Sequence, residues 1–202
     1  MSTDVEAPHR GPEGDIDPTE FDRYAVVAFA TPDICQDVDE IHALAPPCGL
    51  PTLPAHVTVK GTFVEPVDLP EIIARIDRVA RATEPIDIRP DRVATLVRPE
   101  DASVVVLVRP DPALTDLHSR LWDELHGLGR TIYGREVEGE FTPHLTLVQA
   151  IRPDEVPSAM DVIKPRDTQY EFTARTISLV GRRNGTDWET LVDFGLQGAA
   201  DR

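Results

Sequence analysis

The sequence predicts an α+β protein in which two lobes, each a sheet with helices, face each other across a central cleft. Roughly seven strand-like stretches interleave with three or four helical ones, an order typical of this fold class. Similar units occur on each side of the middle of the chain, and no obvious linker divides them. We therefore expect one bilobed domain over residues 23–197, between an acidic disordered arm at 1–22 and a tail at 198–202.

The first half of the chain contains two strand patterns, each followed by a helix pattern. The apolar run at 24–30 predicts a buried strand, and the Thr-Pro pair after it predicts a helix that ends near Ala45. Residues 56–63 alternate with a period of two and are rich in β-branched side chains, which predicts a second strand. Residues 69–82 carry an apolar stripe with helical spacing.

The second half repeats this alternation and ends in a hairpin. Strands are expected at 86–97 with a break near Pro90, and at 103–108, 141–148, 170–180 and 189–194. A helix opens at Asp111 and carries leucines on one face up to Leu128, with Gly127 and Gly129 as its stop signals, and a weaker helix covers 154–163. Asn184-Gly185 predicts the turn between the last two strands.

The net charge of −16 limits the partners that the protein can have. Residues 1–22 hold seven acids against one arginine, and the rest of the chain still carries −10. Proteins that bind long RNA or DNA normally present a basic surface, and no run of Lys or Arg occurs in this chain. The charge therefore disfavours a long duplex nucleic acid as partner, unless the fold hides a basic patch, and is compatible with a small phosphorylated ligand in a locally basic pocket.

The sequence favours a cytoplasmic protein that does not contact membranes. It has no apolar span of 18 residues, and its N-terminus lacks the basic flank and apolar centre of a signal peptide. With Cys35 and Cys48 alone, a disulfide framework is not implied. We also expect a monomer.

Two copies of the pattern His-x-Thr-x carry the predicted chemistry. The first motif is His56-Val-Thr58-Val, and the second motif is His144-Leu-Thr146-Leu, 88 residues later. Residues two apart in a strand point the same way, about 6.6 Å apart, so each strand is apolar behind and presents one imidazole and one hydroxyl in front. One copy alone has little weight, since chance produces it often. Two copies, each with a proline within two residues before it, indicate one shared site.

These side chains suit acid–base chemistry on a phosphate. Imidazole titrates near neutral pH, and a threonine hydroxyl donates a hydrogen bond without adding charge. If the two strands lie on either side of one phosphate, one imidazole takes a proton from the attacking water while the other protonates the leaving oxygen. Each such contribution is worth on the order of 10²–10⁴-fold in rate. No metal or cofactor is required, and we expect neither.

The paired motifs and the run Phe-Thr-Pro-His-Leu-Thr-Leu at 141–147 resemble the 2H phosphoesterase superfamily. Within it, the bacterial and archaeal 2′-5′ RNA ligase-like proteins, or RNA 2′,3′-cyclic phosphodiesterases, are most similar, from residue 24 to about 196. The resemblance implies two lobes related by a pseudo-twofold axis, with both motifs lining a cleft. It also implies hydrolysis of a 2′,3′-cyclic phosphate to a 2′-phosphomonoester without a cofactor.

The resemblance further implies a role for each motif residue. His56 matches the proton donor and His144 the proton acceptor, although the pair is better defined than the division of roles between its members. Thr58 and Thr146 match the residues that bind phosphate. RNA-handling members of the family are often more basic than this chain, which favours small nucleotides over tRNA-sized substrates.

Other side chains are secondary candidates for substrate binding. Lys60 follows the first motif and is expected on the same strand face as His56, where it either adds positive charge to a phosphate pocket or is a solvated strand end. Tyr24 and Trp188 either stack on a base or pack in the core. Arg182 is expected in a hairpin loop that folds over the cleft.

His42, His118 and His126 fall on predicted helices without metal-ligand spacing, and we interpret them as surface residues.

The alternative functions are a phosphodiesterase for 2′-5′ linkages or ADP-ribose cyclic phosphate, and a non-catalytic module that binds nucleotides or RNA ends. The presence of both residues of both motifs favours an enzyme. Ligation of RNA would need a basic surface.

Overall fold

The computed structural model describes residues 16–46, 53–64, 68–98, 100–131 and 141–198. Most of the expected arm, the last residues of the tail and Cys48 lie outside this part of the chain. Within it, the sequence-predicted helices and strands occur in the expected order, and the α+β class is confirmed.

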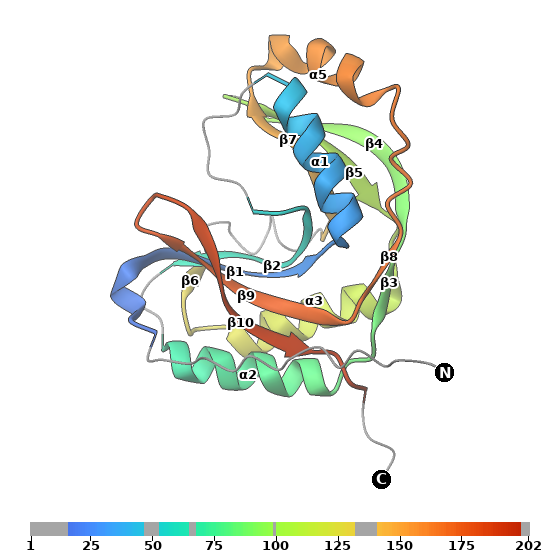
Figure 1. Ribbon diagram of the computed structural model, residues 1–202. Coiled ribbons are helices and arrows are strands. Elements are labelled where there is room, and N and C mark those ends of the chain that lie inside the picture. Colours follow the sequence, from blue (N-terminus) through green and yellow to red (C-terminus); the bar gives the residue numbers. More distant parts are fainter. Residues whose placement is uncertain (1–15, 47–52, 65–67, 99, 132–140, 199–202) are drawn as a thin grey trace.

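One antiparallel sheet runs through the molecule (Figure 1). Its main path, from one edge to the other, is β10 (Trp188–Gly195), β9 (Thr176–Arg183), β1 (Phe21–Phe29), β2 (His56–Val64), β7 (His144–Ile151), β5 (Ala102–Val108) and β4 (Pro90–Val97). The short strand β6 (Arg130–Thr131) pairs with β2, and β3 (Ile86–Ile88) and β8 (Phe172–Ala174) form a separate two-stranded sheet. The two motif strands, β2 and β7, are therefore neighbours at the middle of the sheet.

In the part of the chain that the structure describes, four α-helices and two 3-10 helices accompany the sheet. They are η1 (Pro18–Glu20), α1 (Pro32–Leu44), α2 (Leu69–Arg81), α3 (Pro112–Leu125), η2 (Pro153–Glu155) and α5 (Val156–Ile163). Helices α2 and α3 lie beside the half of the sheet that contains β1, β2, β9 and β10, and α1 and α5 lie beside the other half (Figure 1). The two expected lobes are thus the two halves of one continuous sheet, joined where β2 meets β7.

The order of elements relates the two halves by a pseudo-twofold arrangement. The first half of the chain runs β1, α1, β2, α2, and the second runs β5, α3, β7, α5. In each case the helix that precedes a motif strand contacts the other half, because α1 packs against β7 and α3 packs against β2. The halves are interlocked by this exchange.

A single large apolar core explains why the strands and helices form where they do. The core-facing residues of both motifs, Val57 and Leu145, are 0% and 2% exposed and belong to this core. The buried stripes of the four helices join the same cluster. The helices therefore cover the face of the sheet that lies opposite the histidines and threonines of the motifs.

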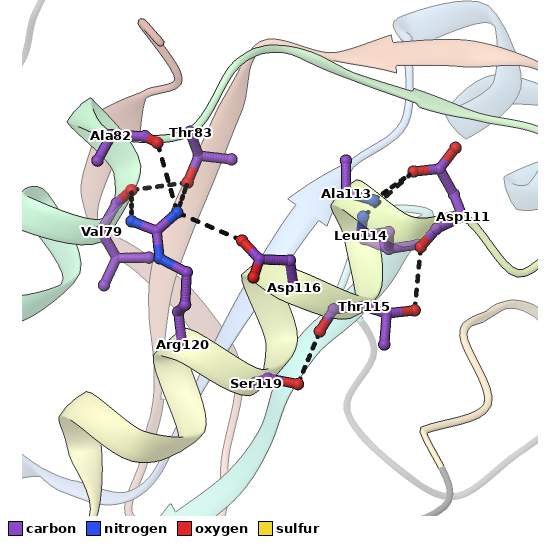
Figure 2. A network of polar contacts seen from close by, with 10 residues as sticks. All are labelled: Val79, Ala82, Thr83, Asp111, Ala113, Leu114, Thr115, Asp116, Ser119 and Arg120. Atoms are coloured by element: carbon purple, nitrogen blue, oxygen red, sulfur yellow. Dashed lines mark hydrogen bonds and ion pairs between the residues drawn. The ribbon is translucent and has the colours of Figure 1, made fainter. Parts of the chain in front are cut away.

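Polar contacts cap the start of α3 and hold α3 against α2 (Figure 2). Asp111 is the N-cap of α3, and its carboxylate accepts hydrogen bonds from the amides of Ala113 and Leu114 at 2.8 and 3.3 Å. Further along α3, Arg120 donates to the carbonyls of Val79 and Ala82 at the end of α2, each at 3.4 Å. These bonds satisfy groups that a helix end leaves unpaired.

Several sequence-predicted boundaries change. The arm was expected to extend to residue 22, but η1 occupies 18–20 and β1 begins at Phe21, so that boundary is wrong. The strand expected at 170–180 divides into β8 and β9, and β9 continues to Arg183. The turn is then made by Asn184 and Gly185, whose φ angles of 36° and 81° are the positive values that an Asn-Gly pair readily adopts.

Candidate active site

The two motifs lie directly beside each other. β2 and β7 are antiparallel and pair with Val57 opposite Leu145. This register places His56 opposite Thr146, and Thr58 opposite His144. The four polar side chains therefore form two crossed pairs, each of one imidazole and one hydroxyl.

All four side chains belong to the face of the sheet that the helices leave open. They are partly exposed, whereas the residues that alternate with them are buried. In an antiparallel pair, residues directly opposite have Cβ atoms about 4.5–5.5 Å apart, and diagonal neighbours about 7–8 Å. The histidines are diagonal neighbours, and so are the threonines. That spacing suits one tetrahedral anion contacted by all four side chains.

Both histidines are held in the same way by the backbone. Nδ1 of His56 lies 2.8 Å from the carbonyl oxygen of Pro54, and Nδ1 of His144 lies 2.8 Å from that of Thr142. Because a carbonyl oxygen only accepts hydrogen bonds, Nδ1 carries the hydrogen in each ring. In the neutral imidazole, Nε2 is then the atom with the free lone pair and the one available for proton transfer.

The surroundings of both rings favour the neutral form. Burial lowers the pKa of His56, the hydrogen bond to Pro54 opposes this, and the neighbouring His144 lowers the pKa further. Burial also lowers the pKa of His144, opposed by the hydrogen bond to Thr142, and the charge of Arg98 adds to the lowering. The electrostatic effect of one motif histidine on the other agrees with their diagonal placement.

The β1 side of the site is apolar. Phe29 lies opposite His56 and Val27 opposite Thr58, so both share the open face with the first motif. The rings of Phe29 and His56 meet edge to face, with centroids 6.2 Å apart. A small cluster of Ala25, Val27 and Val180 continues this surface, and Phe29, Leu53 and Trp188 pack against it. Trp188, a candidate for base stacking, therefore lies on the same face of the sheet as the motif histidines.

The β5 side of the site carries arginines. Leu107 of β5 lies opposite His144, and Arg92 of β4 lies opposite Leu107, so the three share the open face. Arg98, in the turn after β4, acts electrostatically on His144. Both guanidinium groups are exposed and form ion pairs, with Asp91 and Asp101 respectively. The site is therefore bordered by aromatic rings on one side and by cationic groups on the other.

Lys60 does not lie where the sequence pattern placed it. Thr58 is opposite Val27, but Lys60 is opposite Val26, so Val59 is the extra residue of a β-bulge. The bulge turns Lys60 to the helix-covered face, where it is 2% exposed and its Nζ lies 4.2 Å from the centroid of the Trp122 ring. The expectation that Lys60 faces the phosphate with His56 is wrong.

Two further candidates for substrate binding have structural roles. Tyr24 is 0% exposed and stacks on Phe63 in the core, with centroids 5.7 Å apart, so it cannot stack on a base without unfolding. Arg182 belongs to β9 and not to the hairpin loop. Its guanidinium forms a two-point ion pair with the carboxylate of Asp22, which ties β9 to β1.

Two of the three helix histidines are not surface residues. His118 is 9% exposed and donates from Nδ1 to the carbonyl of Val59 at 2.7 Å. His42 is partly buried, and burial lowers its pKa, opposed first by the charge of Asp39 and then by the Leu147 backbone. His126, the C-cap residue of α3, is exposed as expected.

Phe29, Arg92 and Arg98 were not singled out from the sequence. Phe29 ends the apolar run of β1, and only the register beside β2 brings it to His56. The arginines are two of eighteen in the chain, and nothing in their local pattern distinguishes them. Pairing across strands, which a single sequence does not display, locates Phe29 and Arg92, and the effect of its charge on His144 locates Arg98.

Among the described residues, no three or more His, Cys, Asp or Glu side chains are grouped as they would be around a metal ion. In the same part of the chain, no helix is long and apolar enough to cross a bilayer. Cys35 is a free thiol whose Sγ lies near the carbonyls of Ala30 and Ala55.

Two His-x-Thr strands side by side on an antiparallel sheet define the phosphoesterases of the two-histidine, or 2H, class. The chain belongs to the 2′-5′ RNA ligase superfamily, whose family model matches residues 30–186. A relative from Halalkalibacterium halodurans, named "Putative phosphoesterase BH1439", is 27% identical over 145 residues, which cover 71% of this chain and 80% of that protein. A relative of the same description from Bacillus pumilus is 23% identical over 176 residues, or 86% and 97% of the two chains.

Solved structures share the fold. TT0787 of Thermus thermophilus superposes with a TM-score of 0.61 at 19% identity, over 88% of this chain and 100% of that one. LigT of E. coli in complex with 3′-AMP superposes with a TM-score of 0.58 at 17% identity, over 88% and 98% of the two chains. LigT has also been crystallised with NADP+, ATP and phosphate. The resemblance to the 2H superfamily inferred from the motifs is confirmed.

Proposed function

We propose that the protein is a metal-independent phosphodiesterase that opens the 2′,3′-cyclic phosphate of a small nucleotide or an RNA end. The observation that supports this most directly is the register of β2 and β7, which brings both motifs to one patch of the open face. A 2H fold and relatives described as phosphoesterases support the reaction type. The cyclic substrate, the roles of the residues and the independence from metal are the proposal.

The proposed reaction is a single in-line displacement. Water attacks phosphorus, the bond from phosphorus to O3′ breaks, and a 2′-phosphomonoester and a free 3′-hydroxyl result. Nε2 of one motif histidine takes the proton from the water, and Nε2 of the other gives a proton to O3′. The hydroxyls of Thr58 and Thr146 donate hydrogen bonds to the two phosphoryl oxygens that are not displaced.

The environment of the two rings supports His144 as the base and His56 as the acid. A base must be neutral before the reaction, and the charge of Arg98 helps to keep His144 neutral. The acid must carry a proton, and the negative charge of a bound phosphate raises the pKa of an adjacent imidazole. His56, which has no arginine among the causes of its lowered pKa, can gain that proton more readily when substrate binds.

The asymmetry of the site favours an orientation for a nucleotide. A base placed on the β1 side meets Phe29 and Trp188, which offer an aromatic and apolar surface. The complexes of LigT with 3′-AMP and ATP support a small nucleotide as the ligand class. The net negative charge of this chain also supports a small ligand. Exposed arginines such as Arg92 and Arg98 are paired with acids, so little basic surface is left for a long nucleic acid.

A second candidate substrate is ADP-ribose cyclic phosphate. Unlike a cyclic mononucleotide, it contains a pyrophosphate that joins adenosine to the ribose, and Arg92 and Arg98 on the β5 side could contact that additional charge. The same pair of histidines would open its cyclic phosphate. Mutation of both arginines would then reduce turnover of this substrate more than turnover of a cyclic mononucleotide.

A substrate panel in EDTA tests the proposal. The purified protein is incubated with 2′,3′-cyclic AMP, GMP, CMP and UMP, with a 2′-5′ linked dinucleotide and with ADP-ribose cyclic phosphate. We expect release of 2′-monophosphates from the cyclic nucleotides, identified by chromatography against the 3′ isomers. His56→Ala and His144→Ala should each abolish measurable turnover.

The outcomes separate the proposal from its alternatives. Turnover retained in either histidine variant contradicts the assigned roles, and turnover lost in EDTA contradicts metal independence. Binding of 3′-AMP without turnover of any substrate indicates the non-catalytic binding module. Preferred cleavage of the 2′-5′ dinucleotide indicates the other linkage.

A further inference from the structure

The sheet itself joins the two motif strands weakly. β2 and β7 share one register pair, Val57 opposite Leu145, whereas β1 and β2 or β5 and β7 are paired along most of their length. A site that needs four side chains on one phosphate requires a firmer relation between these strands than one pair provides. Contacts behind the sheet therefore become important for the geometry in front of it.

Each motif strand has a bulge directly after its threonine. In β2, Val59 is the extra residue between Thr58 and Lys60. In β7, Thr146 is opposite Val105 and Val148 is opposite Val104, so Leu147 is the extra residue at the equivalent position. Bulges leave the backbone groups of the extra residue without their usual ladder partners.

A histidine from the opposite half of the chain contacts each bulge. His118 of α3 donates from Nδ1 to the Val59 carbonyl at 2.7 Å. On the other side, His42 of α1 approaches the bulge of β7, since the Leu147 backbone, after the charge of Asp39, raises the pKa of His42 against the larger lowering by burial. Since α3 precedes β7 and α1 precedes β2, each helix reaches across to the motif strand that it does not precede.

His118 also contacts the segment that leads into the second motif. Its ring stacks on Phe141 with centroids 4.1 Å apart and planes 7° from parallel. Phe141 precedes Thr142, whose carbonyl orients the ring of His144. One buried side chain thus bonds to the residue after Thr58 and packs three residues before His144.

We propose that His118 is a positioning residue of the active site, which fixes the first motif relative to the second from behind the sheet. It touches no substrate, because it lies on the helix-covered face. Its N–H sets where the bulge after Thr58 lies, and its ring sets where the backbone before His144 lies. This inference rests on the proposed function for its activity readout, and phosphate binding provides a readout that does not.

Two substitutions separate the hydrogen bond from the stacking contact. His118→Phe keeps an aromatic ring on Phe141 and removes the donor to Val59. His118→Asn places an amide N–H close to the position of Nδ1 and removes the ring. We expect His118→Phe to lower kcat by about 10–100-fold with little change in KM, since displacements of about 1 Å at a site cost up to 10²-fold. We expect His118→Asn to recover most of that loss.

A matched control distinguishes positioning from loss of stability. Leu125→Ala removes a buried side chain at the far end of α3. It should lower the Tm at least as much as His118→Phe does and leave kcat unchanged. Wild-type kcat in a folded His118→Phe protein overturns the proposal. So does an equal loss of kcat in His118→Phe and Leu125→Ala.

Inorganic phosphate tests the same idea without turnover. An NMR titration follows the imidazole signals of His56 and His144 as phosphate is added. In the wild type both signals should move with one affinity, and in His118→Phe that affinity should fall about tenfold. Phosphate binding without turnover of any cyclic nucleotide would reject the proposed substrate. The effect of His118→Phe on phosphate affinity would still test the positioning role of His118. Unchanged phosphate affinity in His118→Phe would reject the positioning role.

Discussion

The two motif strands are nearly the same structure in two different surroundings. In both, the histidine donates from Nδ1 to a carbonyl two residues earlier, and a bulge follows the threonine. Around the first motif, however, the open face carries Phe29, whereas around the second it carries Arg92, and the charge of Arg98 acts on His144. The backbone thus duplicates the functional groups, and the neighbouring strands make them different.

This difference has a chemical consequence. Two identical imidazoles in identical surroundings would compete for the same proton, but an acid and a base need different proton affinities. The arginine beside His144 and the aromatic ring beside His56 supply that difference without altering either motif. Experiments that compare equivalent substitutions in the two halves test it directly.

The largest effect is expected from the histidines. His56→Gln and His144→Gln should each lower kcat by about 10²–10⁴-fold, since each removes a general acid–base group. Both pKa values lie below the ordinary value in the free protein, so the base becomes protonated, and activity falls, only at pH values below the ordinary histidine pKa. The residual activity of His144→Gln should lack this acidic limb, and that of His56→Gln should lack the alkaline limb.

His126→Gln, at an exposed helix end, is the control for this pair. It should leave the profile of kcat/KM against pH unchanged. If the acidic limb disappears in His56→Gln and not in His144→Gln, the two roles are exchanged. If both variants keep both limbs, neither ring is the titrating group.

The threonines should show the symmetry of the scaffold. Thr58→Val and Thr146→Val keep the shape and remove one donor to a charged phosphate, which is worth about 1.5–3 kcal/mol. Each should lower kcat/KM by about 10–150-fold, and the two losses should agree within a few-fold. Thr190→Val is the control, because Thr190 lies opposite Val180 on the same face, three strands away from the first motif. A loss confined to one threonine would show that one motif alone contacts the phosphate.

The N-termini of α1 and α3 are capped differently, and this difference should appear in the free energy of unfolding. Asp111 caps α3 with its carboxylate, but the side chain of Thr31 makes no cap hydrogen bond to α1. Asp111→Ala should therefore cost about 1 kcal/mol of unfolding free energy. Thr31→Ala should cost a few tenths at most. Urea unfolding of both variants gives the comparison, and equal costs would contradict the assigned difference in capping.

The smallest effect is expected from the arginine beside the second motif. Arg98→Gln removes a positive charge that lowers the pKa of His144, so that pKa should rise toward its ordinary value while that of His56 stays constant. The acidic limb of the activity profile should move to higher pH in the same direction. NMR titration of the imidazole signals measures both values, with Arg92→Gln as the control. A His144 pKa that stays or falls in Arg98→Gln would contradict the electrostatic link.

The sequence was sufficient to predict the motifs and their strands because both depend on local periodicity. A period of two places His56 with Thr58, and His144 with Thr146, whatever the partners of the strand are. The helices 32–44, 69–81 and 112–125 were predicted within a residue or two for the same reason. The pairing of the two motifs was predicted from their repetition and the family resemblance, and not from any local pattern.

Features that depend on register or on a bulge were not predictable in this way. The period of two fails at the bulge residue Val59, so the sequence pattern predicts Lys60 on the wrong face of β2. Tyr24 was ambiguous because an aromatic residue in a strand fits a core and a binding surface equally well. For His118 the helix pattern predicts a surface residue, because helical spacing does not reveal that a backbone carbonyl lies across from it. Each of these errors concerns a partner that is distant in the chain.

The position of β1 in the sheet leaves one of its edges unpaired while the chain is being synthesised. One edge of β1 pairs with β2, but the other pairs with β9, where Val180 lies opposite Ala25. At ordinary translation rates a chain of 202 residues takes on the order of 10–40 s to synthesise, and that second edge stays open until the last hairpin emerges. An unpaired strand edge invites association between nascent chains. Truncation before β9 should therefore appear first as poor yield and inclusion bodies during expression, and chaperone supply should influence recovery of the full-length protein.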